Sequence, residues 1–220
     1  MCRFLIVKSK KKIQPEELLK SFALACQKSI APDGELQEDG YGIAWKNDKS
    51  WQLKKSLAPI WEEQDLFERI PETNLFVAHA RSAGFVKDKG NLDYNQPFIY
   101  KNLCFVFNGM IRKISLNLPL EGEIGSQKLF SLIKSKLKKH KIGSALEEVK
   151  KLVLKKAKKV EGMNIGLIAG DNIYILCQYL NNQDYFSLYY FRNKNFTIVS
   201  SELFGLYQWK NIKKGEIKTL

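Results

Sequence analysis

The sequence is poor in several features that define common protein classes. Its four cysteines, Cys2, Cys26, Cys104 and Cys177, are widely scattered and form no CxxC pair. A zinc site or a disulfide framework is therefore not expected, nor is any other metal or cofactor, and a special cysteine would act through its reactivity. The apolar runs are far shorter than the roughly 18 residues that span a bilayer, and the N-terminus lacks a signal-peptide pattern. We therefore expect a cytoplasmic protein without membrane contact.

Acidic residues are scarce relative to basic ones, which leaves a formal net charge of +13. Much of the excess lies between Lys128 and Lys159, where apolar residues recur at helical spacing and lysines fall between them. This pattern predicts two amphipathic helices with solvated lysine faces. The second is expected over residues 145–160, with Ser144 and Glu147 spaced as a capping box. Because the lysines are not regularly interleaved with the aromatic residues needed to stack on bases, nucleic-acid binding is not expected.

The remaining segments resemble strands and turns, with helices set apart in blocks. An early helix is expected near Pro15, a residue that suits a first helical turn. Runs of strands on both sides of the lysine-rich helices predict an α+β layered fold and argue against an alternating parallel sheet. At 220 residues, with no long flexible linker, the chain is expected to form a single domain over residues 1–220.

Cys2 is the candidate nucleophile because of its position. It stands just before an apolar run, residues 4–7, that indicates a buried strand. Removal of the initiator methionine would place a thiol and a free α-amine on one residue. An α-amine with a pKa near ~8 can take the thiol proton at neutral pH, whereas a lysine with a pKa near ~10.4 needs strong desolvation. The alternative is that Cys2 is merely a small hydrophobic residue at the start of a strand.

Two other predicted apolar strands end in polar residues that could bind a substrate or take part in catalysis. Arg81 follows the first strand, where its planar guanidinium can present two donors to a carboxylate, although an ordinary strand-end arginine is the alternative. His79, two residues earlier on the same face, is expected to be structural. Asn108 and Gly109 end the second strand. This pair often forms a hairpin turn, but a side-chain amide beside an unhindered N–H also builds an oxyanion hole.

Six short segments are notable together, and they are Met1 to Leu5, Asp39 to Trp45, His79 to Ala83, Gln96 to Phe98, Phe105 to Gly109 and Val199 to Glu202. They occur in the order seen in class II glutamine amidotransferases, which are N-terminal-nucleophile hydrolases. The sequence resembles the stand-alone members of that family along its whole length. The resemblance implies a four-layer αββα sandwich, in which two antiparallel sheets face each other and helices cover the outside.

The resemblance also implies roles for individual residues. Cys2 would be the nucleophile and its liberated α-amine the base, while the Asn108 side chain and the Gly109 N–H would stabilise the oxyanion. Arg81 would bind the α-carboxylate of the substrate. Gly42 would lie close to the nucleophile, where a side chain would obstruct the site. The implied reaction is thiolate attack on the side-chain amide of glutamine, release of ammonia and hydrolysis of a glutamyl thioester.

The sequence departs from the family pattern at the position that binds the α-amino group of glutamine. The family usually has an aspartate there, and the matching residue is Gly125; Glu121 or Glu123 would have to reach the site instead. Gln96 and Phe107 also stand where many members have histidine. Three functions therefore stay open. They are a stand-alone amidotransferase that supplies ammonia to a separate synthase, a hydrolase of a γ-glutamyl peptide or another amide, and a non-catalytic module that binds partners through its lysine-rich helices.

Overall fold

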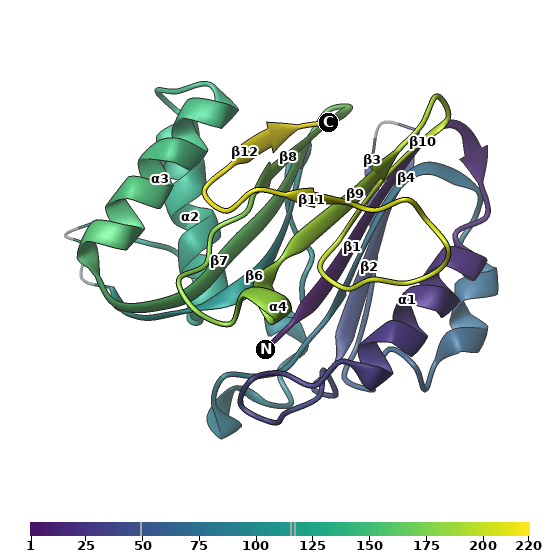
Figure 1. The fold of residues 1–220 in the computed structure, drawn as a ribbon, viewed down its shortest axis with the longest axis horizontal. Helices are drawn as coiled ribbons and strands as arrows, with labels where there is room; N and C mark the ends of the chain where they lie inside the picture. Colours follow the sequence, from purple (N-terminus) through teal and green to yellow (C-terminus); the bar gives the residue numbers. More distant parts are fainter. Residues whose placement is uncertain (49, 115, 117) are drawn as a thin grey trace.

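The computed structural model describes residues 1–48, 50–114, 116 and 118–220, and its strands form two antiparallel sheets (Figure 1). The strands are β1 (Arg3–Ile13), β2 (Tyr41–Asn47), β3 (Ser50–Ser56), β4 (Thr73–Ala80), β5 (Phe98–Tyr100), β6 (Leu103–Ile114), β7 (Ala157–Ala169), β8 (Asn172–Leu176), β9 (Leu188–Arg192), β10 (Phe196–Ser200), β11 (Lys210–Ile212) and β12 (Ile217–Thr219). One sheet has seven strands in the order β11-β9-β10-β1-β4-β2-β3, and the other has five in the order β12-β8-β7-β6-β5.

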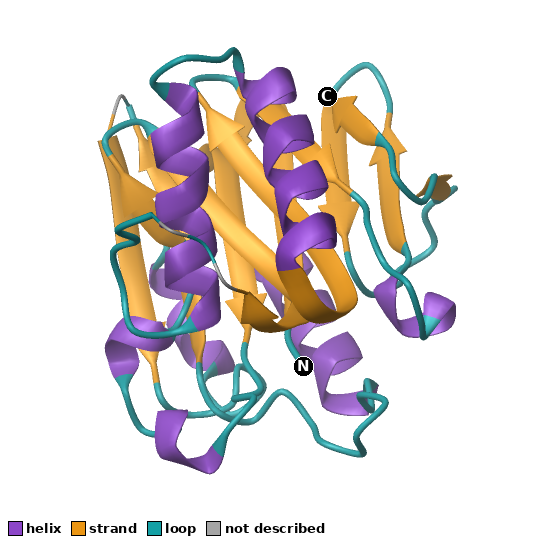
Figure 2. Cartoon of the chain, turned by 90° about the vertical axis from the view of Figure 1, so that its left-hand side faces the viewer, coloured by secondary structure: helices purple, strands orange, loops and turns teal. Residues whose placement is uncertain are grey.

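Helices cover the outer face of each sheet. The helices are α1 (Glu16–Lys28), α2 (Gly125–Leu137), α3 (Ile142–Lys156), α4 (Gln183–Phe186) and the short 3-10 turns η1 (Gln64–Arg69), η2 (Val86–Asp88) and η3 (Leu92–Tyr94). Apolar side chains of α1 pack on the seven-stranded sheet, and those of α2 and α3 pack on the five-stranded sheet. Figure 2 shows two long helices lying side by side across the face of a sheet. The predicted α+β class and αββα layering are therefore confirmed. In the described part of the chain no helix is both long and apolar enough to cross a membrane.

The strand β1 lies near the middle of the seven-stranded sheet because both of its faces are apolar. Phe4 and Ile6 belong to the core between the two sheets, whereas Leu5 and Val7 pack on the outer face with α1. Successive strand residues point to opposite faces, so the uninterrupted apolar run fits a strand that is covered on both sides. This packing fixes the direction in which the chain enters the sandwich, and with it the position of Cys2.

The second lysine-rich helix differs from the prediction at both ends. It begins at Ile142, so Ser144 lies inside its first turn and cannot cap it, and it ends at Lys156. The last four residues of the predicted helix instead begin β7, where Val160 is buried and pairs with Ile111 of β6. The apolar residues there have helical spacing, but pairing with the distant strand β6 makes this segment a strand. The same pairing extends β6 and β7 into a two-stranded ribbon beyond the predicted strand ends.

Candidate active site

Cys2 lies beside a cavity of about 140 Å³ where β1 begins. The side chain is half-buried, and its Sγ atom lies 3.6 Å from the main-chain oxygen of Ser82. Residues that follow β4, residues of β6 and the start of α2 complete the wall of this cavity. Among the predicted site residues, Cys2, Arg81 and Gly109 line it directly. The fold thus brings together three residues that are far apart in the sequence.

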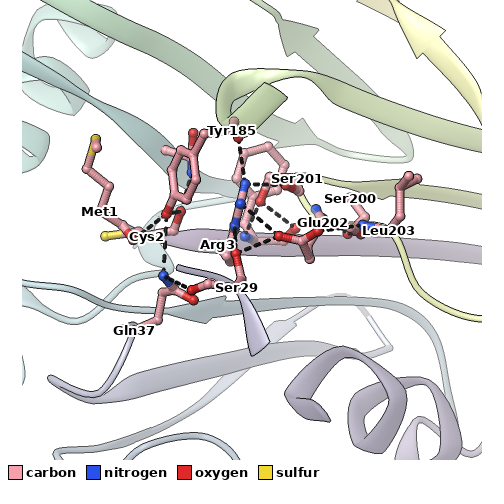
Figure 3. Close-up of polar contacts among 12 residues, drawn as sticks. Met1, Cys2, Arg3, Ser29, Gln37, Tyr185, Ser200, Ser201, Glu202 and Leu203 are labelled. Carbon is pink, nitrogen blue, oxygen red and sulfur yellow. Dashed lines mark hydrogen bonds and ion pairs between the residues drawn. The ribbon is translucent and has the colours of Figure 1, made fainter. Parts of the chain in front are cut away.

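Arg3 fixes the main chain immediately after Cys2. Its guanidinium is almost fully buried and forms an ion pair with Glu202, in which Nη2 lies 2.7 Å from Oε2 (Figure 3). Nε donates to the Ser29 hydroxyl at 2.8 Å, and Nη1 donates to two main-chain oxygens. The guanidinium carbon also lies 3.6 Å from the ring centre of Tyr185. The buried guanidinium thus has an ion-pair partner, hydrogen-bond acceptors and an aromatic ring around it, and these contacts hold the start of β1 in one position.

Tyr185 holds the two N-terminal residues from the other side. Its hydroxyl donates to the main-chain oxygen of Met1 at 2.6 Å and lies 3.4 Å from that of Cys2 (Figure 3). Gln37 donates to the same hydroxyl through Nε2 at 3.4 Å. Burial raises the pKa of Tyr185 far above its ordinary value, so the hydroxyl keeps its proton and remains a donor. Sequence reasoning missed this residue.

Asn108 is buried and directed at Cys2 by a second asparagine. Its Nδ2 donates to the main-chain oxygen of Cys2, while its Oδ1 accepts a hydrogen bond of 3.3 Å from Asn164 Nδ2. Asn164 is the partner of Asn108 in the β6–β7 register, and it also bonds the main chain of Phe186 and Gln178. Sequence reasoning missed Asn164. Its signal was a polar residue next to the apolar run over residues 165–169.

Arg81 carries a buried positive charge that faces the cavity. Only 4% of the residue is exposed, and its donors reach the main-chain oxygens of Asp88 (2.7 Å from Nη2) and Asp39 (3.5 Å from Nη1). The Asp39 carboxylate is paired with Lys89 at 3.0 Å. No acidic side chain in the described ranges forms an ion pair with Arg81. A buried guanidinium in this state favours an incoming carboxylate.

Two glycines permit close packing around the cavity. A Cβ atom on Gly109 would collide with the main-chain oxygen of Gly162, and one on Gly42 would collide with that of Gln96. Gly42 does not line the cavity itself, so a side chain there would act on the site by displacing Gln96, which does. Gln96 in turn accepts a 2.6 Å hydrogen bond from the main-chain N–H of Phe107 through Oε1.

Gly125 lies in the cavity wall at the start of α2, and open space surrounds the point where its Cβ would stand. The two glutamates considered as substitutes for the missing carboxylate do not line the cavity. Glu121 pairs with a lysine of α2, and Glu123 accepts a hydrogen bond from the Tyr94 hydroxyl. The acidic residue that lines the cavity in the described part of the chain is Asp88, which sequence reasoning did not single out.

His79 is buried between the sheets, outside the cavity wall, with Nε2 3.3 Å from the main-chain oxygen of Phe107. Burial is the main cause that lowers its pKa from 6.5 to about 3. Between these values the unfolded chain binds more protons than the folded one, so the free energy of unfolding should decrease as pH falls from 6.5 towards 3. The decrease should approach about 1.4 kcal/mol per pH unit.

Urea unfolding of the wild type and of His79→Gln at several pH values checks this prediction. The glutamine retains a donor for the Phe107 oxygen but does not titrate, so its stability should depend less on pH between 6.5 and 4. Equal slopes for the two proteins would contradict a neutral buried His79.

Comparison with known proteins identifies a relative in sequence and several in structure. No family model matches the chain. The probable glutamine amidotransferase DUG3 of Saccharomyces cerevisiae is 30% identical over 127 residues, a match that covers 50% of this chain and 35% of that protein. The aligned region thus spans about a third of the length of this curated relative.

Two solved structures of similar length match this chain over essentially all of its residues. A glutamine aminotransferase class-II domain protein from Silicibacter pomeroyi has a TM-score of 0.63 and 17% identity, with 99% of this chain and 94% of that chain covered. A predicted glutamine amidotransferase from Pseudomonas aeruginosa has a TM-score of 0.55 and 15% identity, with 99% and 96% covered.

A larger protein matches over about half of its length. The glutamine phosphoribosylpyrophosphate amidotransferase from B. subtilis has a TM-score of 0.60 and 13% identity, with 100% of this chain and 49% of that chain covered. At such identities the likeness shows the fold alone. The sequence match and the structural matches together agree with the resemblance seen in the sequence, and the predicted fold is confirmed as that of these glutamine amidotransferase domains.

Proposed function

We propose that residues 1–220 form a class II glutamine amidotransferase domain in which Cys2, once Met1 is removed, cleaves the side-chain amide of glutamine or of a γ-glutamyl compound. One observation carries the proposal. A single cavity contains the Cys2 thiol, the main chain of Gly109 and the buried Arg81 guanidinium, which lacks an acidic partner among the described residues.

The reaction follows from the groups around Cys2. Its α-amine takes the thiol proton, and the thiolate attacks the amide carbon. The Gly109 N–H, and Asn108 Nδ2 through the hydrogen that is not bonded to the main-chain oxygen of Cys2, donate to the oxygen that becomes negative in the transition state. The carbon–nitrogen bond then breaks, and the nitrogen leaves as ammonia or an amine after it receives the proton from the α-ammonium group. Water attacks the thioester, which releases glutamate and restores the thiol.

The rest of the cavity suits the amino-acid end of such a substrate. We propose that Arg81 binds the α-carboxylate and that Asp88, the acidic residue of the described cavity wall, binds the α-ammonium group in the absence of an acidic residue at position 125. Tyr185 loses the Met1 oxygen as its acceptor when the methionine departs, and it continues to hold the main-chain oxygen of Cys2. For the ammonia produced from glutamine, we propose that a separate synthase is the acceptor.

An intact-mass measurement tests this proposal. The natively expressed protein should lack Met1, and a diazo ketone analogue of glutamine should add one label, which maps to Cys2. The other cysteines act as internal controls because they are buried. Burial raises the pKa of the Cys177 thiol to about 11 and raises those of Cys26 and Cys104 as well. A chain that keeps Met1 and takes no label would overturn the proposal and favour a non-catalytic binding module.

A further inference from the structure

The hydroxyl of Tyr185 lies beside the peptide bond between Met1 and Cys2 (Figure 3). It donates to the Met1 oxygen at 2.6 Å and lies 3.4 Å from the Cys2 oxygen. The Met1 oxygen is two covalent bonds away from the Cys2 nitrogen, so the hydroxyl lies within about 5 Å of that nitrogen. Removal of Met1 therefore leaves the hydroxyl and the new amine within reach of a direct hydrogen bond or of one bridging water.

The position of Tyr185 does not depend on Met1. Arg3 Nη1 donates to the main-chain oxygen of Tyr185 at 2.6 Å, and the Arg3 guanidinium packs on its ring. The next residue, Phe186, accepts a 2.7 Å hydrogen bond from Asn164 through its main-chain oxygen. These contacts hold α4 from β1 and from β7. The hydroxyl is therefore held in place whether or not the methionine is present.

The bonds of the Tyr185 hydroxyl leave room for one more donor. A hydroxyl has one proton and two lone pairs. Gln37 Nε2 donates to one lone pair at 3.4 Å, and the proton goes to the Met1 oxygen. Gln37 is itself fixed, because it is fully buried and Nε2 also donates to the main-chain oxygen of Ser29 at 3.0 Å. Among the described residues no other donor reaches this hydroxyl, so its second lone pair is unused.

The charged groups nearest to this point are paired or neutral. The Glu202 carboxylate is bonded to Arg3 and to the Ser29 hydroxyl. Burial raises the pKa of the Cys26 thiol and lowers that of His79, so both groups are neutral at pH 7. Neutral acceptors such as the Tyr185 hydroxyl are therefore the partners left for an ammonium group on Cys2. The other charged groups of this region are Glu35, which accepts from the Ser82 hydroxyl, and the cavity residues Arg81, Asp88 and Arg112.

We propose that the Tyr185 hydroxyl binds the α-amine of Cys2 in the mature protein and orients it towards the thiol, and that Gln37 holds the hydroxyl in this role. This inference rests on the proposed function of Cys2. The hydroxyl accepts from one N–H of the amine and donates its own proton to the Cys2 oxygen. The amine thereby keeps its lone pair for the thiol proton, and Tyr185 stabilises the ammonium group that this transfer creates. Tyr185 is thus a positioning residue, which acts through the base.

Tyr185→Phe tests the proposal, because it removes the hydroxyl and keeps the ring that packs against Arg3. In the mature variant, kcat on the best substrate should fall about 10- to 100-fold, the usual effect of losing a hydrogen bond to a charged group. KM should stay within about twofold, since Tyr185 does not line the cavity. The rate at which the diazo ketone labels Cys2 should fall by a similar factor, and this second measurement requires no natural substrate.

The pH profile separates a role at the base from a role in packing. An ammonium group that loses an acceptor gives up its proton more easily, so the midpoint on the acidic side of the kcat/KM profile should fall by roughly one pH unit in Tyr185→Phe. Tyr179→Phe is the matched control. Tyr179 is equally buried and lies outside the cavity wall, so this variant should keep the kcat and the acidic midpoint of the wild type.

Gln37→Leu adds a test of the second residue. It should lower kcat by a smaller factor, because the hydroxyl remains but loses one support. The double variant with Tyr185→Phe should be no more than about twofold slower than Tyr185→Phe alone, since Gln37 acts through the hydroxyl. Additive losses in the double variant would show that Gln37 acts independently, which would contradict its part in the proposal.

Intact mass comes first, and each variant should lack Met1 because residue 2 is unchanged. If Tyr185→Phe keeps the kcat and the acidic midpoint of the wild type, or only its melting temperature falls, the Tyr185 proposal is wrong and the function of Cys2 stands. Retention of Met1 in Tyr185→Phe alone would assign the residue to maturation and would also overturn the proposal. If the wild type cleaves no amide and Cys2 takes no label, the proposed function itself is wrong.

Discussion

Replacing Cys2 with alanine should abolish amide cleavage by the mature protein, with a decrease in kcat on the order of 10⁴-fold or more, as expected when a nucleophile is removed. The fold should survive, because the thiol is half-buried and, among the described residues, its hydrogen-bond contact is the long one to the Ser82 oxygen. The start of β1 is held instead by Arg3 and Tyr185. Steady-state rates of the purified variant, together with its melting temperature, measure both parts of this expectation.

Two comparisons make this result specific. Cys2→Ser keeps an oxygen nucleophile beside the same α-amine, so it should retain more activity than Cys2→Ala while remaining far below the wild type. Both variants should still lose Met1, because serine and alanine are also small, and mass spectrometry should verify this before rates are compared. Wild-type activity in Cys2→Ala would show that another group performs the reaction.

Replacing Asn108 with alanine should lower kcat by about 10²- to 10³-fold, the usual cost of removing one oxyanion donor. KM should change little, because the donor acts on charge that develops in the transition state and not on the neutral amide. The measurement is kcat and KM on the best substrate, with urea unfolding as a check on stability, since Asn108 is fully buried and bonds to Asn164.

An isosteric variant distinguishes loss of the donor from loss of packing. Asn108→Asp preserves the shape of the side chain but places an acceptor and a negative charge where the oxyanion forms, so its kcat should be at least as low as that of Asn108→Ala. If both variants keep kcat within threefold of the wild type while they unfold more easily, Asn108 has a structural role only.

The layers of the fold and part of the site could be predicted because they depend on local patterns. The alternation and length of the apolar runs indicated strands, and the order of short motifs placed Cys2, Arg81 and Gly109 together. The end of α3 could not be predicted, because residues up to Val160 keep an acceptable helical spacing and only pairing with β6 makes the last of them a strand.

The residues that hold the site were harder to predict because their partners are distant in the sequence. Arg3 contacts Tyr185 and Glu202, which come nearly two hundred residues later, and no local spacing relates them. Asn164 meets Asn108 through strand register.

The burial of Met1 sets an order of events during biosynthesis. In the folded chain Met1 is only 5% exposed, and its carbonyl oxygen is bonded to Tyr185, so a peptidase has little access to its peptide bond. Tyr185 leaves the ribosome long after the N-terminus, by roughly 10 to 40 s at about 5 to 20 residues per second. If Cys2 acts as proposed, excision of the methionine must therefore occur on the nascent chain, and a polypeptide that folds before this step would stay inactive.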